Sequence, residues 1–212
     1  MEQYDGIIFD LDGTLWDASE ASAKGWTAAL LSCRILGCDI SATDIKGVSG
    51  KPFQDCVEAL VPRASISSRP DVFVALEAYE RSSLEEHGGV AYEGVVEGIP
   101  RLAQHYDLFL VSNCQQWYLE CFWKQFRLQP FFTDWDCHGA SRLSKAMMIE
   151  AMVRRHDLAK PIYVGDTGGD KRAADDAEID FAHVSYGFGH VGGPSVTFSS
   201  FGDLVAWLPA NA

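Results

Sequence analysis

Three short apolar runs, each followed directly by acidic or small polar residues, are the feature that most constrains the fold of this chain. The runs are residues 6–9, 108–111 and 162–165, and the residues after them are Asp10, Ser112, Asn113 and Asp166. Runs of this length and composition are typical of strands buried on both faces of a parallel sheet. Segments with helical periodicity lie between them. We therefore predict an α/β fold with a doubly wound parallel sheet, a Rossmann-like core.

The remaining elements of this alternating part follow from the same patterns. Helices are expected near residues 95–105, around the aromatic residues Trp117, Phe122 and Trp123, and near 145–156 and 171–177; further strands are expected near 131–135 and 181–184. The carboxyl ends of parallel strands meet at one edge of the sheet, and ligands bind there. We expect the polar residues that follow the strands to gather at this edge.

A helical block interrupts the chain after the first strand. Apolar residues recur at helical spacing in three stretches, and Ser41 and Gly37 have the form of a helix start and a helix end. In the last stretch, Val72 and Leu76 form an apolar stripe, and the other side carries Glu77, Glu80 and Arg81. We expect a core made of residues 1–16 and 90–212 and an inserted α-helical domain made of residues 17–89.

The chain is strongly acidic, with 17 Lys and Arg against 30 Asp and Glu and a formal net charge of −13 over 212 residues. Such a surface repels phosphate backbones and anionic lipids, which argues against nucleic-acid and membrane binding. The sequence MEQYDGIIFD lacks the features of a signal peptide, and no apolar run has the roughly 20 residues of a membrane helix. The six cysteines have neither disulfide nor zinc spacing. We expect a soluble cytoplasmic protein, either a monomer or a homodimer.

Four carboxylates follow two of the predicted strands. Asp10 and Asp12 flank Leu11 after the first strand, and Asp166 and Asp170 follow a later one. Carboxylates gathered at one edge of a sheet repel one another unless a cation lies between them. Oxygen ligands without a cluster of Cys or His favour magnesium. The sequence therefore predicts a Mg²⁺ site at this edge.

Together with Thr14, Ser112 and Lys145, these carboxylates form a pattern that resembles the haloacid-dehalogenase-like hydrolase superfamily. Residues 10–14, Asp-Leu-Asp-Gly-Thr, are similar to its first motif, and Ser112 at the end of a strand is similar to its second. Lys145 fits the third motif, and residues 165–170, Gly-Asp-Thr-Gly-Gly-Asp, fit the fourth. The helical insertion stands where this family has its cap domain. The branch that the chain resembles is the phosphoglycolate-phosphatase-like one with a helical cap.

The resemblance implies roles for the carboxylates. Asp10 would be the nucleophile that forms an aspartyl-phosphate, and Asp12 would be the general acid and base. Magnesium would be held by Asp10, by the backbone carbonyl of Asp12 and by Asp166. Asp170 would support the metal site or Lys145 from behind.

The resemblance also implies a phosphate site. Ser112, Asn113 and Lys145 would bind the phosphoryl group, and Thr14 would support this site through the Asp10 loop. Lys145 would in addition supply positive charge during catalysis. The family usually has Pro after this Lys, whereas this chain has Ala146, and Arg142 is the alternative cation.

We therefore expect a magnesium-dependent phosphatase that hydrolyses a small phosphorylated metabolite. The alternative is a phosphomutase of the β-phosphoglucomutase type, which shares all of these residues. A 2-haloacid dehalogenase, which lacks the second Asp of the first motif, and a non-catalytic binding protein fit less well. In the insertion, Lys46 and Lys51 flank a glycine-containing loop that corresponds in place to the family's substrate-specificity loop. These two lysines either contact an anionic substrate group or are solvated.

Overall fold

A six-stranded parallel sheet forms the centre of the protein in a computed structural model, which describes residues 4–193 and 196–210. The strand order is β5-β4-β1-β6-β7-β8, and each neighbouring pair is parallel. The strands are β1 (Gly6–Phe9), β4 (Asp107–Ser112), β5 (Asp134–Cys137), β6 (Pro161–Gly165), β7 (Asp180–Val184) and β8 (Val196–Phe198). The predicted α/β fold with a doubly wound parallel sheet is confirmed.

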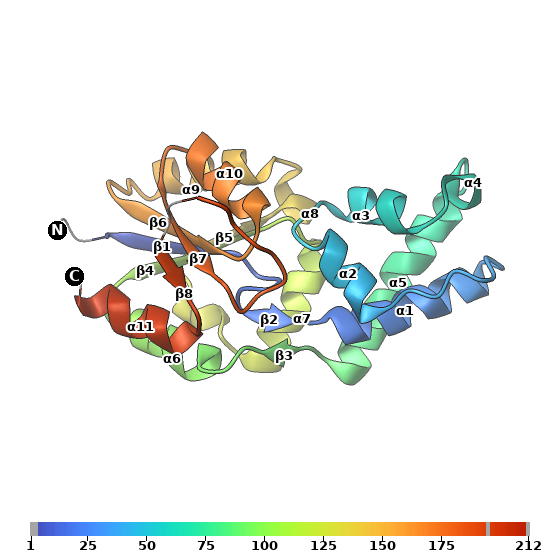
Figure 1. The fold of residues 1–212 in the computed structure, drawn as a ribbon, viewed down its shortest axis with the longest axis horizontal. Coiled ribbons are helices and arrows are strands. Elements are labelled where there is room, and N and C mark those ends of the chain that lie inside the picture. Colours follow the sequence, from blue (N-terminus) through green and yellow to red (C-terminus); the bar gives the residue numbers. More distant parts are fainter. Residues whose placement is uncertain (1–3, 194–195, 211–212) are drawn as a thin grey trace.

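Helices cover both faces of the sheet (Figure 1). One face carries α6 (Val95–Leu102), α7 (Gln116–Phe126) and α11 (Phe201–Ala210), and the other carries α9 (Lys145–Arg155) and α10 (Gly168–Asp176). Successive side chains of a strand point to opposite faces. Accordingly, Ile7 and Phe9 of β1 pack in the first apolar core and Ile8 packs in the second, all three fully buried. This central strand therefore holds both layers of helices.

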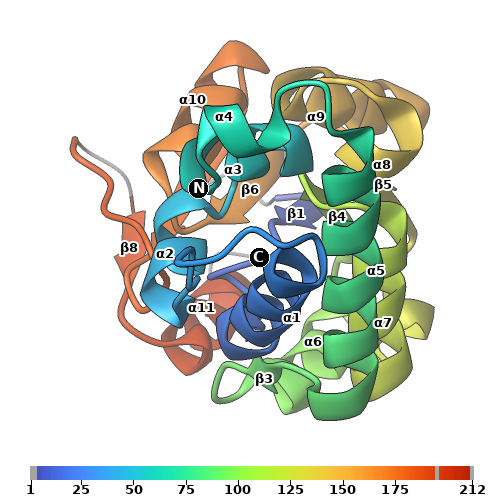
Figure 2. The same cartoon turned by 90° about the vertical axis from the view of Figure 1, so that its right-hand side faces the viewer.

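A two-stranded antiparallel ribbon joins the sheet to a helical cap domain (Figure 1). The ribbon consists of β2 (Trp16–Asp17) and β3 (Val90–Ala91), and the helices between them are α1 (Ser19–Ser32), α2 (Ala42–Val48), α3 (Phe53–Leu60), α4 (Arg63–Ile66) and α5 (Pro70–His87). Helices α1 and α5 lie side by side (Figure 2). Gly25 permits this close approach, because a Cβ at this position would lie only 2.6 Å from the Cα of Glu80. The cap domain has its own core, which includes Trp26 and Leu76.

Two helices begin with reciprocal hydrogen bonds known as capping boxes. At α2, Ser41 Oγ accepts from the Asp44 amide and Asp44 accepts from the Ser41 amide. Thr167 and Asp170 form the same arrangement at α10. Helix α10 thus begins at Gly168 rather than near residue 171, since the cap offsets the weak helix propensity of two successive glycines.

Other predicted bounds also need correction. Helix α1 ends at Ser32, so Gly37 lies in the next loop rather than at the helix end. Residues Gln129–Phe131 form a 3₁₀ turn in which the amides of Phe131 and Phe132 donate to the carbonyls of Leu128 and Gln129, and β5 begins after it, at residue 134. The short helix α8 (His138–Ser141), strands β2, β3 and β8, and helices α4 and α11 were not predicted. None of the described helices has both the length and the hydropathy of a membrane span.

Candidate active site

Three neighbouring strands bring the predicted site residues to one edge of the sheet. Strand β1 pairs with β4 on one side and with β6 on the other, so the residues after these strands are neighbours. Asp10 follows β1, Ser112 ends β4 and Asp166 follows β6. The Asp10 amide donates to the Val164 carbonyl over 2.9 Å, which extends the β1–β6 pairing up to the site.

Lys145 lies at the centre of this edge. Its Nζ is 2.8 Å from Oδ1 of Asp10 and 2.6 Å from Oδ1 of Asp170, and all three side chains are buried. Lys145 is the first residue of α9, whose start is capped by Ser144. The alternative cation, Arg142, is exposed to solvent and lies outside this cluster. Of the two candidates, Lys145 is therefore the one that the fold brings to Asp10.

Asp170 is tied to the capping box of α10. Its Oδ2 accepts from the amide of Thr167 at 2.9 Å and from Thr167 Oγ1 at 2.6 Å, and its Oδ1 accepts from Lys145. Both carboxylate oxygens thus have protein partners. Asp170 fixes Lys145 relative to the sheet.

The remaining oxygens suit a divalent cation. Oxygens of Asp10, Asp166 and Asp170 lie within 4.8 Å of one another. Asp10 Oδ2 and Asp166 Oδ1 are buried and have no hydrogen-bond partner among the described residues. Buried polar atoms are rarely left unpaired without a ligand or water. Two carboxylates of this cluster thus each have an open oxygen, a donor set that fits Mg²⁺.

Glycines allow the chain to close around Asp166. Its Oδ2 accepts from the amides of Phe188 at 2.6 Å and Gly189 at 3.2 Å. A Cβ on Gly13, whose φ is +77°, would collide with this carboxylate, and a Cβ on Gly187 would collide with it as well. Both positions therefore require glycine, and the amides of Phe188 and Gly189 fix the orientation of Asp166.

The charges of the cluster are out of balance. Burial raises the pKa of Asp10 well above its ordinary value, although Lys145 acts against this rise. Burial, followed by the negative charge of Asp170, raises the pKa of Asp166 to about 7. Burial alone would lower the pKa of Lys145, but Asp10 and Asp170 hold it well above the ordinary value. One ammonium thus faces three carboxylates, and a bound cation would stabilise their ionised forms.

Asp12 has a different environment from Asp10. Its Oδ1 accepts from the hydroxyl of Tyr118 at 2.6 Å and from the indole N–H of Trp16 at 3.2 Å. Burial raises the pKa of Asp12 to about 6, and the Tyr118 hydrogen bond opposes the rise. A carboxyl group with this pKa can hold or release a proton near neutral pH, as a general acid or base must.

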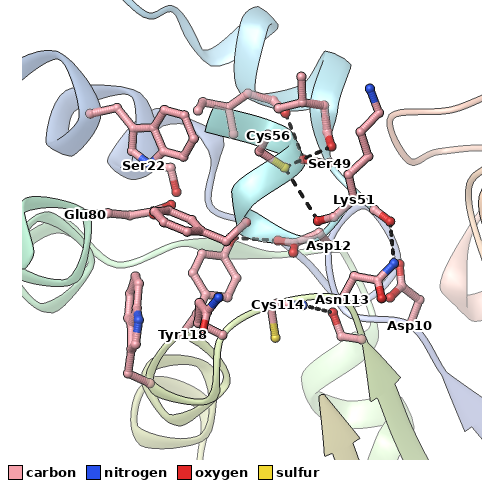
Figure 3. A pocket seen from close by; sticks show the side chains of 18 residues that line it. Asp10, Asp12, Ser22, Ser49, Lys51, Cys56, Glu80, Asn113, Cys114 and Tyr118 are labelled. Carbon is pink, nitrogen blue, oxygen red and sulfur yellow. Dashed lines mark hydrogen bonds between the residues drawn. The ribbon is translucent and has the colours of Figure 1, made fainter. Parts of the chain in front are cut away.

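The predicted phosphate-binding residues divide into two groups. Ser112 and Asn113 line a cavity beside Asp10 and Asp12. The Asn113 side chain also donates to the carbonyl of Gly50 in the cap domain over 2.7 Å (Figure 3). Thr14 is buried and is not among the residues that line this cavity. Its carbonyl accepts from Tyr186 at 2.8 Å, which anchors the turn that follows Asp10.

The cavity lies between the sheet edge and the cap domain, and a volume of about 70 Å³ within it is accessible to the centres of water molecules. Its walls come from the loops after β1 and β4, from α7, and from helices α1, α2, α3 and α5 of the cap (Figure 3). Lys51 lines the cavity, whereas Lys46 pairs with Asp17 at 2.7 Å and lies over the ring of Phe188. The cap lysines are thus not equivalent.

Two residues of this cavity were missed from the sequence. Tyr118 lies within the helix predicted around Trp117 and Trp123 but is not among the predicted site residues, and Glu80 was placed on the polar side of its helix. The structure shows that Glu80 is only 6% exposed and lines the cavity. The signal was present in the spacing, because Glu80 lies four residues after Leu76 and four before Leu84, both buried.

Comparison with known proteins agrees with the geometry. The family model for haloacid dehalogenase-like hydrolases matches residues 7–184. The chain belongs to this family. The resemblance found in its motifs is therefore confirmed. No curated protein matches the sequence.

Solved structures show that the fold of this haloacid dehalogenase-like hydrolase is shared over nearly its full length. A haloacid dehalogenase-like hydrolase from Streptococcus pneumoniae is 20% identical, with a TM-score of 0.82 over 98% of this chain and 99% of that one. A protein described as a predicted phosphoglycolate phosphatase, from Haemophilus somnus, is 22% identical, with a TM-score of 0.80 over 98% and 99%. A predicted phosphatase from Clostridium acetobutylicum is 18% identical, with a TM-score of 0.78 over 99% and 100%.

Proposed function

We propose that this haloacid dehalogenase-like hydrolase is a magnesium-dependent phosphatase that hydrolyses a small phosphomonoester through an aspartyl-phosphate. One observation carries the proposal. Asp10 and Asp12 line the same cavity in unlike environments, one paired with a buried ammonium and the other hydrogen-bonded to a phenol. Two carboxyl groups held in different states are what a nucleophile and an acid–base residue require. The similarity to structures described as predicted phosphatases supports this reaction class.

The first half-reaction uses both carboxyl groups. A carboxylate oxygen of Asp10 attacks phosphorus and forms the aspartyl-phosphate, while the bond from phosphorus to the ester oxygen breaks. Asp12 gives its proton to the departing alkoxide, so that the product leaves as an alcohol. In the second half-reaction, Asp12 takes a proton from the water that attacks the aspartyl-phosphate. Inorganic phosphate and the two original carboxyl groups result.

The remaining site residues are proposed to hold the metal, to supply positive charge and to bind the phosphoryl group. Asp10, Asp166 and the backbone carbonyl of Asp12 would hold Mg²⁺, which would offset the negative charge of the phosphoryl oxygens when bound. Lys145 provides a second positive charge beside Asp10, and Asp170 positions it. Ser112 and Asn113 provide a hydroxyl and an amide for a phosphoryl oxygen. Thr14 supports the turn that carries Asp10 and Asp12.

The substrate class follows from the enclosure of the site. A cavity between the sheet edge and the cap domain, with about 70 Å³ accessible to the centres of water molecules, suits a small phosphorylated metabolite rather than a macromolecule. A cytoplasmic location is part of the proposal, since all six cysteines are free thiols, as in a reducing compartment.

Release of inorganic phosphate from an alkyl phosphate whose alkyl group is uncharged, measured with Mg²⁺ and with a chelator, tests the proposal. The expected result is turnover that requires the metal and that falls by several orders of magnitude in Asp10→Asn. Asp12→Ala should lower it by about 10²–10⁴-fold, and Asp12→Asn should be no better, because an amide cannot exchange this proton. Conversion of a sugar phosphate to its isomer faster than phosphate release would instead indicate a phosphomutase. Halide release from 2-chloropropionate that is undiminished in Asp12→Ala would indicate a dehalogenase.

A further inference from the structure

Glu80 places a carboxylate at the cap end of the cavity, away from the reacting groups. It belongs to α5, is 6% exposed and makes no ion pair with any of the described residues. Figure 3 shows it on the opposite side of the cavity from Asp10, with Tyr118 between it and Asp12. The mechanism above gives Glu80 no task. An acid buried without a cationic partner costs free energy, which calls for an explanation.

Polar groups around Glu80 support its ionised form. Burial raises the pKa of Glu80 to about 7, and the indole N–H of Trp26 and the hydroxyl of Ser22, both from α1, act against this rise. Both donors are buried, and neither has a hydrogen-bond partner among the described residues. This end of the cavity therefore holds a prepared acceptor that lacks a counter-charge.

The other walls around this acceptor are mainly apolar and aromatic. They include Trp26, Phe53, Trp117 and Tyr118. Aromatic faces attract cations, and they offer few partners to a polyhydroxylated sugar. Lys51 is the one cationic residue in the described lining, and its ammonium points away from Glu80 (Figure 3). An anionic end of a substrate would thus meet a carboxylate, whereas an ammonium would meet its complement.

We propose that Glu80 is a specificity-determining residue that binds a substrate ammonium group, and that the preferred substrates are aminoalkyl phosphate monoesters. The phosphoryl group would lie at Asp10, and the alkyl chain would pass Tyr118 to Glu80. The products would be an amino alcohol and inorganic phosphate. A carboxylated ester such as phosphoglycolate would be disfavoured at this site. The inference rests on the proposed phosphatase activity and adds the chemistry of the leaving group.

A pair of isosteric esters tests this inference. 2-Aminoethyl phosphate has an ammonium group where propyl phosphate has a methyl group. Phosphoglycolate has a carboxylate instead and serves as the anionic substrate. The wild type should show a kcat/KM about 10–100-fold higher for 2-aminoethyl phosphate than for propyl phosphate, as a charge-assisted hydrogen bond implies. Glu80→Gln should bring this ratio to about 1, mainly by lowering kcat/KM for 2-aminoethyl phosphate. Glu80→Asp, which keeps the charge, should retain part of the preference.

Glu86→Gln is the matched control, because Glu86 is an exposed acid on the same helix. It should leave the ratio unchanged. Equal rates for the two isosteres in the wild type, or a preference for phosphoglycolate, would overturn the inference while leaving the phosphatase proposal intact. Failure to hydrolyse any ester with Mg²⁺ would overturn the phosphatase proposal itself. The comparison of substrates on the wild type needs no variant, so a folding defect in Glu80→Gln would not block the test.

Discussion

Lys145 and Asp170 form a buried ion pair in which Nζ donates to Oδ1 over 2.6 Å. The two residues come from different helices, α9 and α10, that pack on the same face of the sheet. Because Asp170 also closes the capping box of α10, the position of the ammonium beside Asp10 depends on how this helix begins. The start of α10 thus helps to determine where the ammonium beside Asp10 lies.

Removal of the ammonium should destabilise the fold. In Lys145→Met, Asp10 and Asp170 remain buried without a cation, and breaking such a pair costs about 3–5 kcal/mol. The free energy of unfolding, measured by denaturant titration with a chelator present, checks this value. The double variant Lys145→Met with Asp170→Asn should recover part of the loss, since it removes one of the stranded charges. Purely additive effects of the two substitutions would show that the pair is not coupled.

The two capping boxes provide a matched comparison. Ser41→Ala in α2 and Thr167→Ala in α10 remove the same kind of bond, and each should cost about 1 kcal/mol of stability. Only Thr167→Ala should also lower kcat, because it removes one of the two hydrogen bonds to Asp170 Oδ2 and so loosens Lys145. Thermal denaturation and phosphate release measure the two effects. Equal losses of activity in both variants would show that the capping box of α10 has no specific effect on the site.

Magnesium should stabilise the folded protein. A metal that binds the native state at 100 times its Kd adds about 2.7 kcal/mol, because the unfolded chain lacks the site. The rise in melting temperature between chelator and saturating Mg²⁺ should disappear in Asp166→Asn and persist in Glu97→Gln, which alters an exposed acid. An equal rise in all three proteins would place the metal elsewhere.

Glu80 should make stability depend on pH. Its pKa rises from 4.5 to about 7 on folding, so the native state binds more protons than the unfolded chain between these values. Stability due to this group is therefore present in acid and is lost as pH rises from about 4.5 through 7. The full difference amounts to roughly 3 kcal/mol. The free energies of unfolding of the wild type and Glu80→Gln are measured at pH 4.5 and pH 8 with a chelator present. Relative to the variant, the wild type should be less stable at pH 8 than at pH 4.5. If the difference in free energy of unfolding between the two proteins is the same at both pH values, folding does not raise the pKa of Glu80.

The sheet was predictable because its central strands have a clear pattern in the sequence. Strands β1, β4 and β6 are buried on both faces and therefore appear as unbroken apolar runs. Since parallel strands end at one edge, the proximity of Asp10 and Asp166 followed from the sequence alone. The edge strand β8 has only three residues, and its first two are not fully buried, so no such run marks it.

The cavity was harder to predict, because it depends on how helices far apart in the sequence pack together. Asp12 and Tyr118 are hydrogen-bonded although 106 residues separate them, and local periodicity contains no information on this contact. The contact of Lys145 with Asp10 was likewise accessible only through the resemblance to the family motif. Glu80 was missed for a different reason. Because Glu80 is acidic, it was assigned to the polar side of its helix, although its spacing from Leu76 and Leu84 places it on the buried side.

The β2–β3 ribbon also bears on the order of folding. Strands β1 and β4 pair although their partner residues, such as Gly6 and Asp107, are about a hundred positions apart. Closing so long a loop carries an entropic cost. Once Trp16 has paired with Ala91, most of the intervening chain is already enclosed within the cap, and the loop that remains to be closed is short. The sheet therefore assembles with a smaller loss of chain entropy when the cap helices fold first, which links the rate of forming the active-site edge to local helix formation in the insertion.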